Sequence, residues 1–269
     1  MLKDITIGQY YAARSPIHAL DPRTKLVGVL VFMVLIFIIS SPLEYIALSV
    51  MTLIFVALSK VPVRFILKGL KPIFILILVT AILNLFLANG EMVIWQFYFL
   101  KITREGAVLA AKMIVRIVLL IIISSLLTLT TSPTVLTSGL ESLMKPLSKI
   151  GFPAQEIAMM MSIALRFIPT LADEADKIIK AQTSRGSDFE TGGILKKAKA
   201  LVPLFVPLFV SAFRRADELA MAMETRCYRS GAKRTSYTAL KYKKGDAAAF
   251  LLMVIAFFGI IILHFGGLG

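Results

Sequence analysis

The sequence predicts an all-α, polytopic membrane protein with about five transmembrane helices and a long helical region outside the membrane. Hydrophobic residues make up 58% of its 269 residues and charged residues only 17%, whereas soluble domains average about half apolar and about a quarter charged residues. The formal net charge is +14, and polytopic membrane proteins concentrate Lys and Arg in their cytoplasmic loops. The membrane therefore explains the basic excess, and no nucleic-acid partner is expected.

Residues 1–25 form a polar lead-in to the membrane. They carry charges and two prolines, Pro16 and Pro22, which prevent a long helix. They contain no short apolar core and no small-residue cleavage site, so a cleavable signal peptide is not expected. The first apolar helix would then direct membrane insertion itself.

Five apolar segments are long enough, or nearly so, to cross a bilayer. At about 1.5 Å per residue, a helix needs roughly 20 residues to cross a hydrocarbon core of about 30 Å. A turn at residues 40–42 separates the first two segments, and a basic cluster at residues 60–71 precedes the third. The predicted spans are residues 26–41, 43–59, 70–88, 106–130 and 246–263.

Three polar side chains inside the predicted spans, Asn84, Lys112 and Arg116, are candidates for a functional role. Asn84 is expected to form an interhelical hydrogen bond, the commoner role of such a residue, although it could line a transport path. Lys112 and Arg116 are four residues apart and share a helix face, and intramembrane charges often serve function. Both lie near a helix end, so snorkelling or local packing is the favoured interpretation.

Residues 89–105 hold aromatic side chains suited to the outer interface: Trp95, Phe97, Tyr98 and Phe99.

Charge asymmetry predicts the orientation. Residues 132–245 hold 18 Lys and Arg against 10 Asp and Glu, a net charge of +8, while the outer loops are nearly balanced. The N-terminus and residues 132–245 are therefore expected in the cytoplasm, and the C-terminus outside. The predicted domains follow: residues 1–131 are the lead-in and four transmembrane helices, residues 132–245 are the cytoplasmic helices, and residues 246–269 are the last transmembrane helix.

Three amphipathic helices, without a convincing span, are predicted within residues 132–245. They cover residues 133–150, 153–184 and about 194–227, and glycines close the first two. Residues 201–213 are the most apolar stretch, but they are short and broken by Pro203 and Pro207. This stretch is expected at the membrane boundary or against a partner protein.

The last two of these helices end in the same pattern. With one constant offset and no gaps, residues 175–186 (ADKIIKAQTSRG) match residues 216–227 (ADELAMAMETRC) at several positions, including both arginines. Arginine forms bidentate pairs with carboxylates, so two matched arginine ends indicate a paired docking device. The alternative is that both arginines only complement the negative ends of the helix dipoles.

The chain shows no catalytic pattern of its own. It has no glycine-rich phosphate-binding loop, its two histidines are isolated, and its single cysteine, Cys227, excludes an internal disulfide. Asp173, Glu174 and Asp176 could hold Mg²⁺, but neighbouring lysines and arginines can equally pair with them. Because the chain has a docking device but no nucleotide site of its own, we expect the docking partner to be an ATPase.

Five short motifs carry a family resemblance over most of the chain. They are residues 8–10 (GQY), 15–25 (SPIHALDPRTK), 103–106 (TREG), 184–186 (SRG) and 223–227 (METRC). Together they resemble the transmembrane T component of energy-coupling factor (ECF) transporters, whose signature is two Ala-Arg-Gly-like triplets. Both central arginines and Gly186 fit this signature, whereas Ser184, Thr225 and Cys227 depart from it.

The resemblance implies that the chain joins two ATP-binding-cassette (ABC) ATPases to a separate substrate-binding membrane subunit, the S component. It implies uptake of a vitamin or metal ion across the cytoplasmic membrane of a prokaryote. ATP and Mg²⁺ would be bound by the partner ATPases, with no cofactor, metal or catalysis in this chain. The last two cytoplasmic helices become coupling helices, and the implied ATPase-coupling residues are Ser184, Arg185, Gly186, Thr225, Arg226 and Cys227.

Two other functions remain open on the residues alone. A membrane-embedded, Mg²⁺-dependent phosphotransferase would need the carboxylates near Asp173. A self-sufficient secondary carrier would move its substrate without ATPases, and Lys112 or Arg116 would then be essential.

Overall fold

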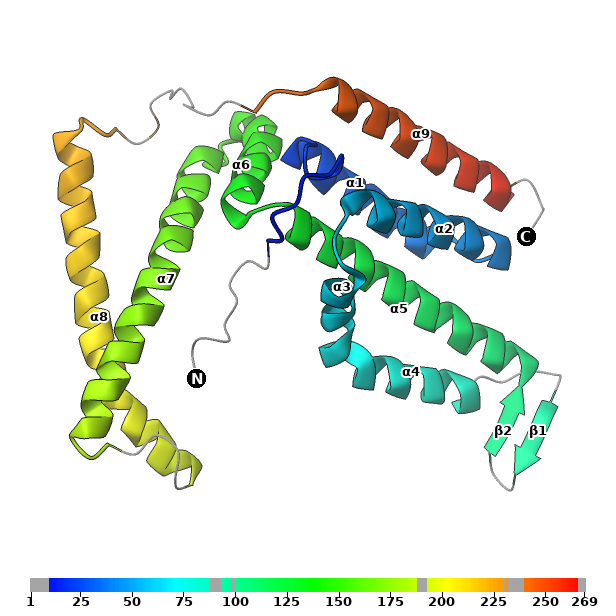
Figure 1. Cartoon of the computed structure of the whole chain (residues 1–269), viewed down its shortest axis with the longest axis horizontal. Helices are drawn as coiled ribbons and strands as arrows, with labels where there is room; N and C mark the ends of the chain where they lie inside the picture. Colours follow the sequence, from blue (N-terminus) through cyan, green and yellow to red (C-terminus); the bar gives the residue numbers. More distant parts are fainter. Residues whose placement is uncertain are drawn as a thin grey trace. The chain divides into compact units, whose positions relative to one another are not determined.

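The computed structural model describes residues 10–87, 93–97, 100–187, 193–229, 231 and 240–265, and helices dominate them (Figure 1). The predicted all-α fold class is confirmed, with one short β-hairpin added between two helices. The α-helices are α1 (Pro22–Ile38), α2 (Pro42–Ser59), α3 (Val63–Leu70), α4 (Phe74–Leu87), α5 (Arg104–Thr130), α6 (Pro133–Met144), α7 (Ala154–Ser184), α8 (Ile194–Thr225) and α9 (Lys244–Phe265). Short 3₁₀ turns are η2 (Lys71–Ile73) and η3 (Lys145–Ile150), and the strands are β1 (Val93–Phe97) and β2 (Leu100–Thr103).

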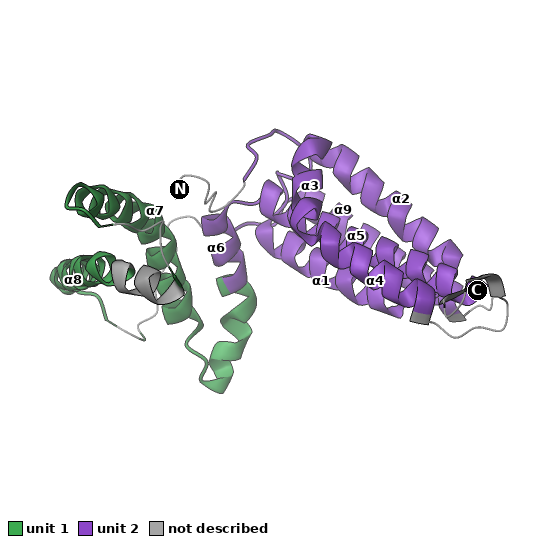
Figure 2. Cartoon of the chain, turned by 90° about the horizontal axis from the view of Figure 1, so that it is seen from below, with its two compact units in different colours: residues 1–7, 141–239 green, residues 8–140, 240–269 purple. Residues whose placement is uncertain are grey.

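The described residues fall into two compact units (Figure 2). Those within residues 8–140 and 240–269 form the first, which we call the membrane unit. Those within residues 141–239 form the second, which we call the coupling unit because it carries the matched arginine ends. The boundary between the units lies inside α6.

Four helical segments among the described residues are long and apolar enough to cross a membrane. They are Pro42–Ser59, Val63–Phe86, Arg104–Thr130 and Lys244–His264. The 17-residue helix α1 packs against α5 and α9 and supplies the remaining predicted span. Helices α1, α2, α5 and α9 share one core, formed by Phe32, Leu35, Ile36, Ile39, Tyr45, Leu48, Leu119, Ile123, Leu126 and Ile260.

The third membrane segment begins earlier than predicted. The prediction started it at residue 70, whereas the helical run starts at Val63 and continues through η2 into α4. Arg64 and Lys68 of the basic cluster therefore lie in a helix. They stay exposed, while Ile66 on the opposite face of α3 is buried, as expected of an amphipathic helix. The Asn84 amide donates to the carbonyl oxygen of Thr80 in its own helix at 2.8 Å, so the expected interhelical bond is absent among the described contacts.

The hairpin β1–β2 was not predicted. Its strands pair antiparallel, with Trp95 opposite Ile102 and Phe97 opposite Leu100. Of the predicted aromatic cluster, Tyr98 and Phe99 lie outside the described residues. The interfacial role of that cluster stays a prediction.

Lys112 and Arg116 of α5 hold the turn between α1 and α2. The Lys112 ammonium donates to the carbonyl oxygen of Ser40, and the Arg116 guanidinium donates to that of Ile39 at 3.2 Å. These carbonyls lie beyond the end of α1, where a helix leaves its last acceptors without intrahelical partners. Local packing therefore accounts for both charges inside α5.

Glu44 binds the same turn from the other side. Its carboxylate, on a residue only 1% exposed, accepts from the backbone N–H groups of Ser40 and Ser41 at 2.8 and 3.0 Å. Its second oxygen lies 3.2 Å from Nδ1 of His264 in α9. Side chains of α5 and α2 thus bind one short turn, and His264 of α9 lies against the Glu44 carboxylate.

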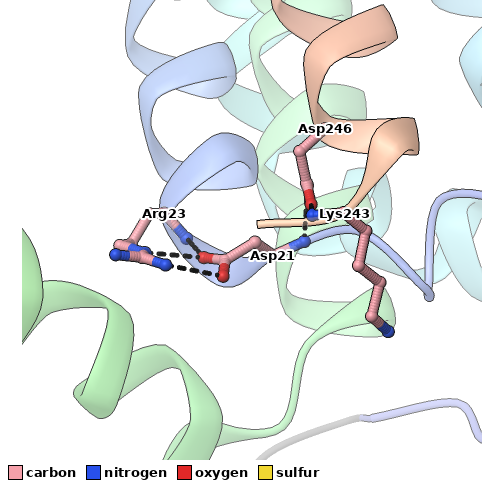
Figure 3. Close-up of polar contacts among 4 residues, drawn as sticks. All are labelled: Asp21, Arg23, Lys243 and Asp246. Atoms are coloured by element: carbon pink, nitrogen blue, oxygen red, sulfur yellow. Dashed lines mark hydrogen bonds and ion pairs between the residues drawn. The ribbon is translucent and has the colours of Figure 1, made fainter. Parts of the chain in front are cut away.

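A second polar cluster joins the start of α1 to the start of α9 (Figure 3). Asp21 caps α1 by accepting from the Arg23 backbone N–H and pairs with the Arg23 guanidinium, both at 2.9 Å. Asp246, which is 1% exposed, accepts from the backbone N–H groups of Asp21 and Lys243 at 2.8 and 2.7 Å. Burial by itself would raise the pKa of the Asp21 carboxyl, but the bonds and charge of Arg23 outweigh burial and hold that pKa below its ordinary value.

The lead-in before α1 is packed onto the membrane unit from Tyr10 onward. The Tyr11 backbone N–H donates to the carbonyl oxygen of Leu129 at 2.9 Å, and His18 bridges Tyr11 and Ser15 through its two ring nitrogens. Burial lowers the pKa of His18 and so favours its neutral ring. Gly8 and Gln9 of the first motif lie outside the described residues.

Candidate coupling site

The coupling unit is built on two long helices that run in opposite directions and pack against each other (Figure 1). Their observed ranges, Ala154–Ser184 for α7 and Ile194–Thr225 for α8, agree with the predicted ones. The expectation that prolines break the apolar part of α8 was wrong, because the helix continues through Pro203 and Pro207. Each proline removes only one backbone N–H from the ladder, and packing along the rest of a long helix tolerates that loss.

Glu174 fastens the two helices where they cross. Its carboxylate accepts from the Arg215 guanidinium at 2.9 Å and from the Ser211 hydroxyl, both on α8. The pair is only partly shielded, with side chains 34% and 23% exposed. This pairing across helices replaces the pairing within one helix that the sequence suggested for the Asp173 cluster. Among the described residues there is no group of three side chains suited to a metal ion.

Helix α7 ends in a double hydrogen-bonded cap at the first arginine. The Gly186 N–H donates to the carbonyl oxygen of Thr183, and the Ser187 N–H donates to that of Gln182, each at 3.0 Å. Gly186 has φ +90°, the left-handed conformation that this cap requires. Glycine adopts it without steric cost, so Arg185 is held as the last residue before a sharp reversal of the chain.

Helix α8 ends in the same cap at the second arginine. The Cys227 N–H donates to the carbonyl oxygen of Glu224 at 2.9 Å, and the Tyr228 N–H donates to that of Met223 at 3.0 Å. The two arginines have nearly equal backbone angles, φ −89° and ψ 6° at Arg185 against φ −91° and ψ 15° at Arg226. The sequence echo is therefore also a geometric one.

The two caps differ at their left-handed residue. Cys227 has φ +57°, a conformation that costs a residue with a Cβ roughly 1–2 kcal/mol. Cys227 in place of the signature glycine thus raises the conformational energy of the backbone, while the cap hydrogen bonds are kept.

All six predicted coupling residues lie on the surface at these two helix ends. Ser184, Arg185, Gly186, Thr225, Arg226 and Cys227 are all exposed. The Ser184 and Thr225 hydroxyls donate back to their own helices at 3.0 Å. Within the described part of the chain, neither the Arg185 nor the Arg226 guanidinium forms an ion pair or hydrogen bond. Because α7 and α8 are antiparallel, the two arginines stand at opposite ends of the helix pair.

Backbone groups, not guanidinium groups, make the cap hydrogen bonds at both helix ends. Each arginine's own N–H also donates to its helix, Arg185 to Gln182 and Arg226 to Met223. The side chains are therefore not needed as hydrogen-bonding caps. The docking role and the helix-dipole role both stay predictions.

One face of α8 is apolar and exposed, and we call it the α8 apolar face. Its side chains recur every three or four residues, which is the spacing of one helix face. They are Val202, Phe205, Val206, Phe209, Val210 and Phe213, each 52–62% exposed. A helix face of this kind normally packs against something. Residues 201–213 thus present one continuous apolar surface. Its placement at the membrane boundary or against a partner stays a prediction.

Three features of the coupling unit escaped the sequence analysis. They are the Glu174–Arg215 pair, the left-handed Cys227, and a groove of about 430 Å³ between α7 and α8 lined by Phe167, Leu219 and Tyr228, among others. The repeated helix ends in the sequence could have indicated the two caps. A single sequence holds no pattern that identifies residues as far apart as Glu174 and Arg215 as partners.

Taken together, these units define a multi-pass membrane protein with a separate helical unit, and comparisons with known proteins show its family. The family model described as cobalt transport protein, CbiQ, matches residues 13–237. The chain belongs to this family, whose members include the transmembrane component of ECF transporters.

Curated relatives match nearly the whole chain and are called energy-coupling factor transporter transmembrane protein EcfT. The one from Acidaminococcus fermentans is 52% identical over 99% of both chains. The one from Clostridium kluyveri is 56% identical over 95% of both. The one from Bacillus subtilis is 44% identical over 95% of this chain and 96% of the relative. The predicted family is confirmed, and the chain functions as a transporter membrane component within a complex.

Neither alternative function gains support from the structure. Glu174, one of the carboxylates that a phosphotransferase would need, is engaged by α8. Lys112 and Arg116, which a secondary carrier would use, bind carbonyl oxygens of the α1–α2 turn.

Proposed function

We propose that Arg185 and Arg226 are the two points at which a pair of ABC-type ATPases dock on this chain. The observation that carries the proposal is the shared cap geometry, which presents an exposed arginine at each end of one helix pair. A guanidinium pairs with carboxylates in a bidentate fashion. Two equivalent arginine ends fit two similar acidic grooves, one on each ATPase.

Movement of the ATPases would be transmitted through the helix pair. A fixed cap transfers a displacement of the arginine to the helix axis, and the Glu174–Arg215 pair joins the two axes at their crossing. Closure of the ATPases on ATP and Mg²⁺ would then change the angle between α7 and α8. In this scheme the chain holds no nucleotide, metal or catalytic group, and hydrolysis takes place in the partners.

The α8 apolar face supports a second contact, with a substrate-binding S component in the membrane. That subunit would select a vitamin or other micronutrient, and this chain would be shared machinery for its uptake. The family description names cobalt and the relatives' names give no substrate. Relatives' names without a substrate fit a division in which specificity resides in another chain.

The proposed topology keeps the N-terminus and residues 132–245 in the cytoplasm and the C-terminus outside the cell membrane. Residues 1–131 contribute the lead-in and four spans, and residues 246–269 contribute the last one. The basic excess of residues 132–245 supports this orientation.

Charge reversal at both arginines tests the coupling proposal. The double variant Arg185→Glu, Arg226→Glu should abolish ATP-driven uptake and stop co-purification of the ATPases, because two attractive pairs become repulsive. The chain should still insert, since neither side chain forms an ion pair or hydrogen bond within the described residues. A matched control is Arg166→Glu with Arg214→Glu, which places the same charge change on exposed positions of the same helices.

The control should keep the ATPases bound. Normal uptake and ATPase recovery in the Arg185, Arg226 double variant would refute the proposal.

A further inference from the structure

The membrane unit contains a groove that the coupling function does not use. It has a volume of about 370 Å³ and lies between α1, α2, α5 and α9. Its walls are apolar, with Phe32 and Leu35 of α1 in the interior and the exposed Leu58 and Leu252 among its lining residues. Small residues of α1 and α9 make the space: Gly28, Ala248, Ala249 and Ala256.

The groove is too small for another helix. Its volume of about 370 Å³ is less than that of one turn of a helix about 10 Å wide. A single hydrocarbon chain is slender enough for such a space. Because helices that can span a membrane form three of its four walls, acyl chains are the apolar molecules that surround it.

The polar end of the groove adjoins a run of exposed lysines. Gly245 lines the groove at the start of α9, and Lys241, Lys243 and Lys244 immediately precede it on the surface. The Lys243 side chain points away from the Asp21–Asp246 cluster (Figure 3). Basic clusters next to the end of a transmembrane helix attract anionic lipid headgroups.

Lys25, the one charged residue in the groove lining, is already engaged. Its ammonium donates to the carbonyl oxygen of Thr130 at 3.0 Å, to the Thr131 hydroxyl at 3.2 Å and to the carbonyl oxygen of His18 at 3.4 Å. An ammonium has three protons to donate, so Lys25 holds the fold together. The exposed Lys241, Lys243 and Lys244 at the start of α9 can meet a headgroup.

We propose that this groove binds an anionic phospholipid. One acyl chain lies between α1, α2, α5 and α9, and the phosphate-bearing headgroup contacts Lys241, Lys243 and Lys244. The proposal rests on the membrane unit alone and is independent of the arginine docking sites.

A lipid carrying a photoreactive diazirine in its acyl chain tests the proposal. The full-length chain in nanodiscs is labelled with the phosphatidylglycerol or the phosphatidylcholine form of the probe, and labelled peptides are mapped. The anionic probe should label the groove residues of α1 and α9 at least about fivefold more strongly, the factor expected from one well-placed lysine.

Two variants separate headgroup from acyl-chain recognition. Changing Lys241, Lys243 and Lys244 to Gln should reduce labelling by the anionic probe to the level of the neutral one. Ala249→Phe keeps the lysines but fills the groove, so labelling should move to the outer helix faces. A matched control changes Arg64, Lys68 and Lys71 to Gln, three exposed cations of another cluster, and should leave groove labelling intact.

The proposal is overturned if wild-type labelling misses the groove. It is also overturned if both probes label the groove equally, or if the control triple variant loses as much labelling as the lysine triple variant. The mapping on the wild-type chain decides the question even if Ala249→Phe does not fold.

Discussion

The membrane unit and the coupling unit use charged side chains in opposite ways. In the membrane unit, Asp246 and Glu44 are buried and accept backbone N–H groups, Asp246 from Asp21, 225 positions away, and Glu44 from the adjacent turn at Ser40. In the coupling unit, Arg185 and Arg226 are exposed at capped helix ends that do not need them. Buried charges that are fully bonded hold a fold together, whereas exposed and unpaired ones are available to partners.

The same contrast holds for apolar side chains. Those of α1, α2, α5 and α9 share a common core, and their outer faces suit lipid. The α8 apolar face is exposed because α7 is the one other long helix described in its unit and does not cover that face. Substitutions should therefore damage stability in one unit and assembly in the other.

The largest expected loss of stability follows removal of a buried carboxylate. Asp246→Ala leaves the N–H groups of Asp21 and Lys243 without acceptors, and each buried unpaired donor costs about 1–3 kcal/mol. We expect a loss of about 3 kcal/mol, measured as a lowered unfolding midpoint of the detergent-solubilised chain. The matched substitution of an exposed carboxylate, Asp173→Ala, should leave that midpoint unchanged. Equal midpoints for the two variants would contradict the contrast between the units.

The Glu174–Arg215 pair should show a smaller effect. Its side chains are partly exposed, so solvent weakens the attraction. A double-mutant cycle with Glu174→Ala and Arg215→Ala should give a coupling energy of about 1 kcal/mol. Single variants should also reduce uptake if the pair joins the two helix axes. Unchanged uptake together with a measurable coupling energy would limit the pair to a structural role.

The coupling helices could be predicted from sequence because their signals are local. Pro153 marks the start of α7, and the Arg185-Gly186 step marks its end. The echo at Arg226 then located the end of α8. The third membrane span was placed too late because its first turns are amphipathic, and a search for continuous apolar runs does not see such a helix.

The polar ties of the membrane unit could not be predicted. Asp21 and Asp246 are 225 positions apart, and nothing in either local sequence identifies the other as its neighbour. Lys112 and Arg116 were seen as charges on one face, but their acceptors are backbone carbonyl oxygens, which leave no trace in a sequence. Partners of this kind become visible only when the helices are packed.

The smallest expected effects distinguish the two arginine caps. Gly186→Ala places a Cβ on a residue at φ +90° and should destabilise the end of α7 by about 1 kcal/mol. Cys227→Gly removes the same kind of strain from α8, but glycine gains freedom in the unfolded chain. The net gain should be under about 0.5 kcal/mol.

Amide hydrogen exchange measures both effects at the cap hydrogen bonds. Protection of the Ser187 amide should fall in the Gly186→Ala variant, and protection of the Tyr228 amide should stay equal or rise in the Cys227→Gly variant. ATPase binding should persist in the second variant because Arg226 keeps its cap. If Cys227→Gly instead lowered the protection of the Tyr228 amide, the two helix ends would not share one mechanism of capping. The similar geometry of Arg185 and Arg226 would then be no argument that the two arginines have the same role.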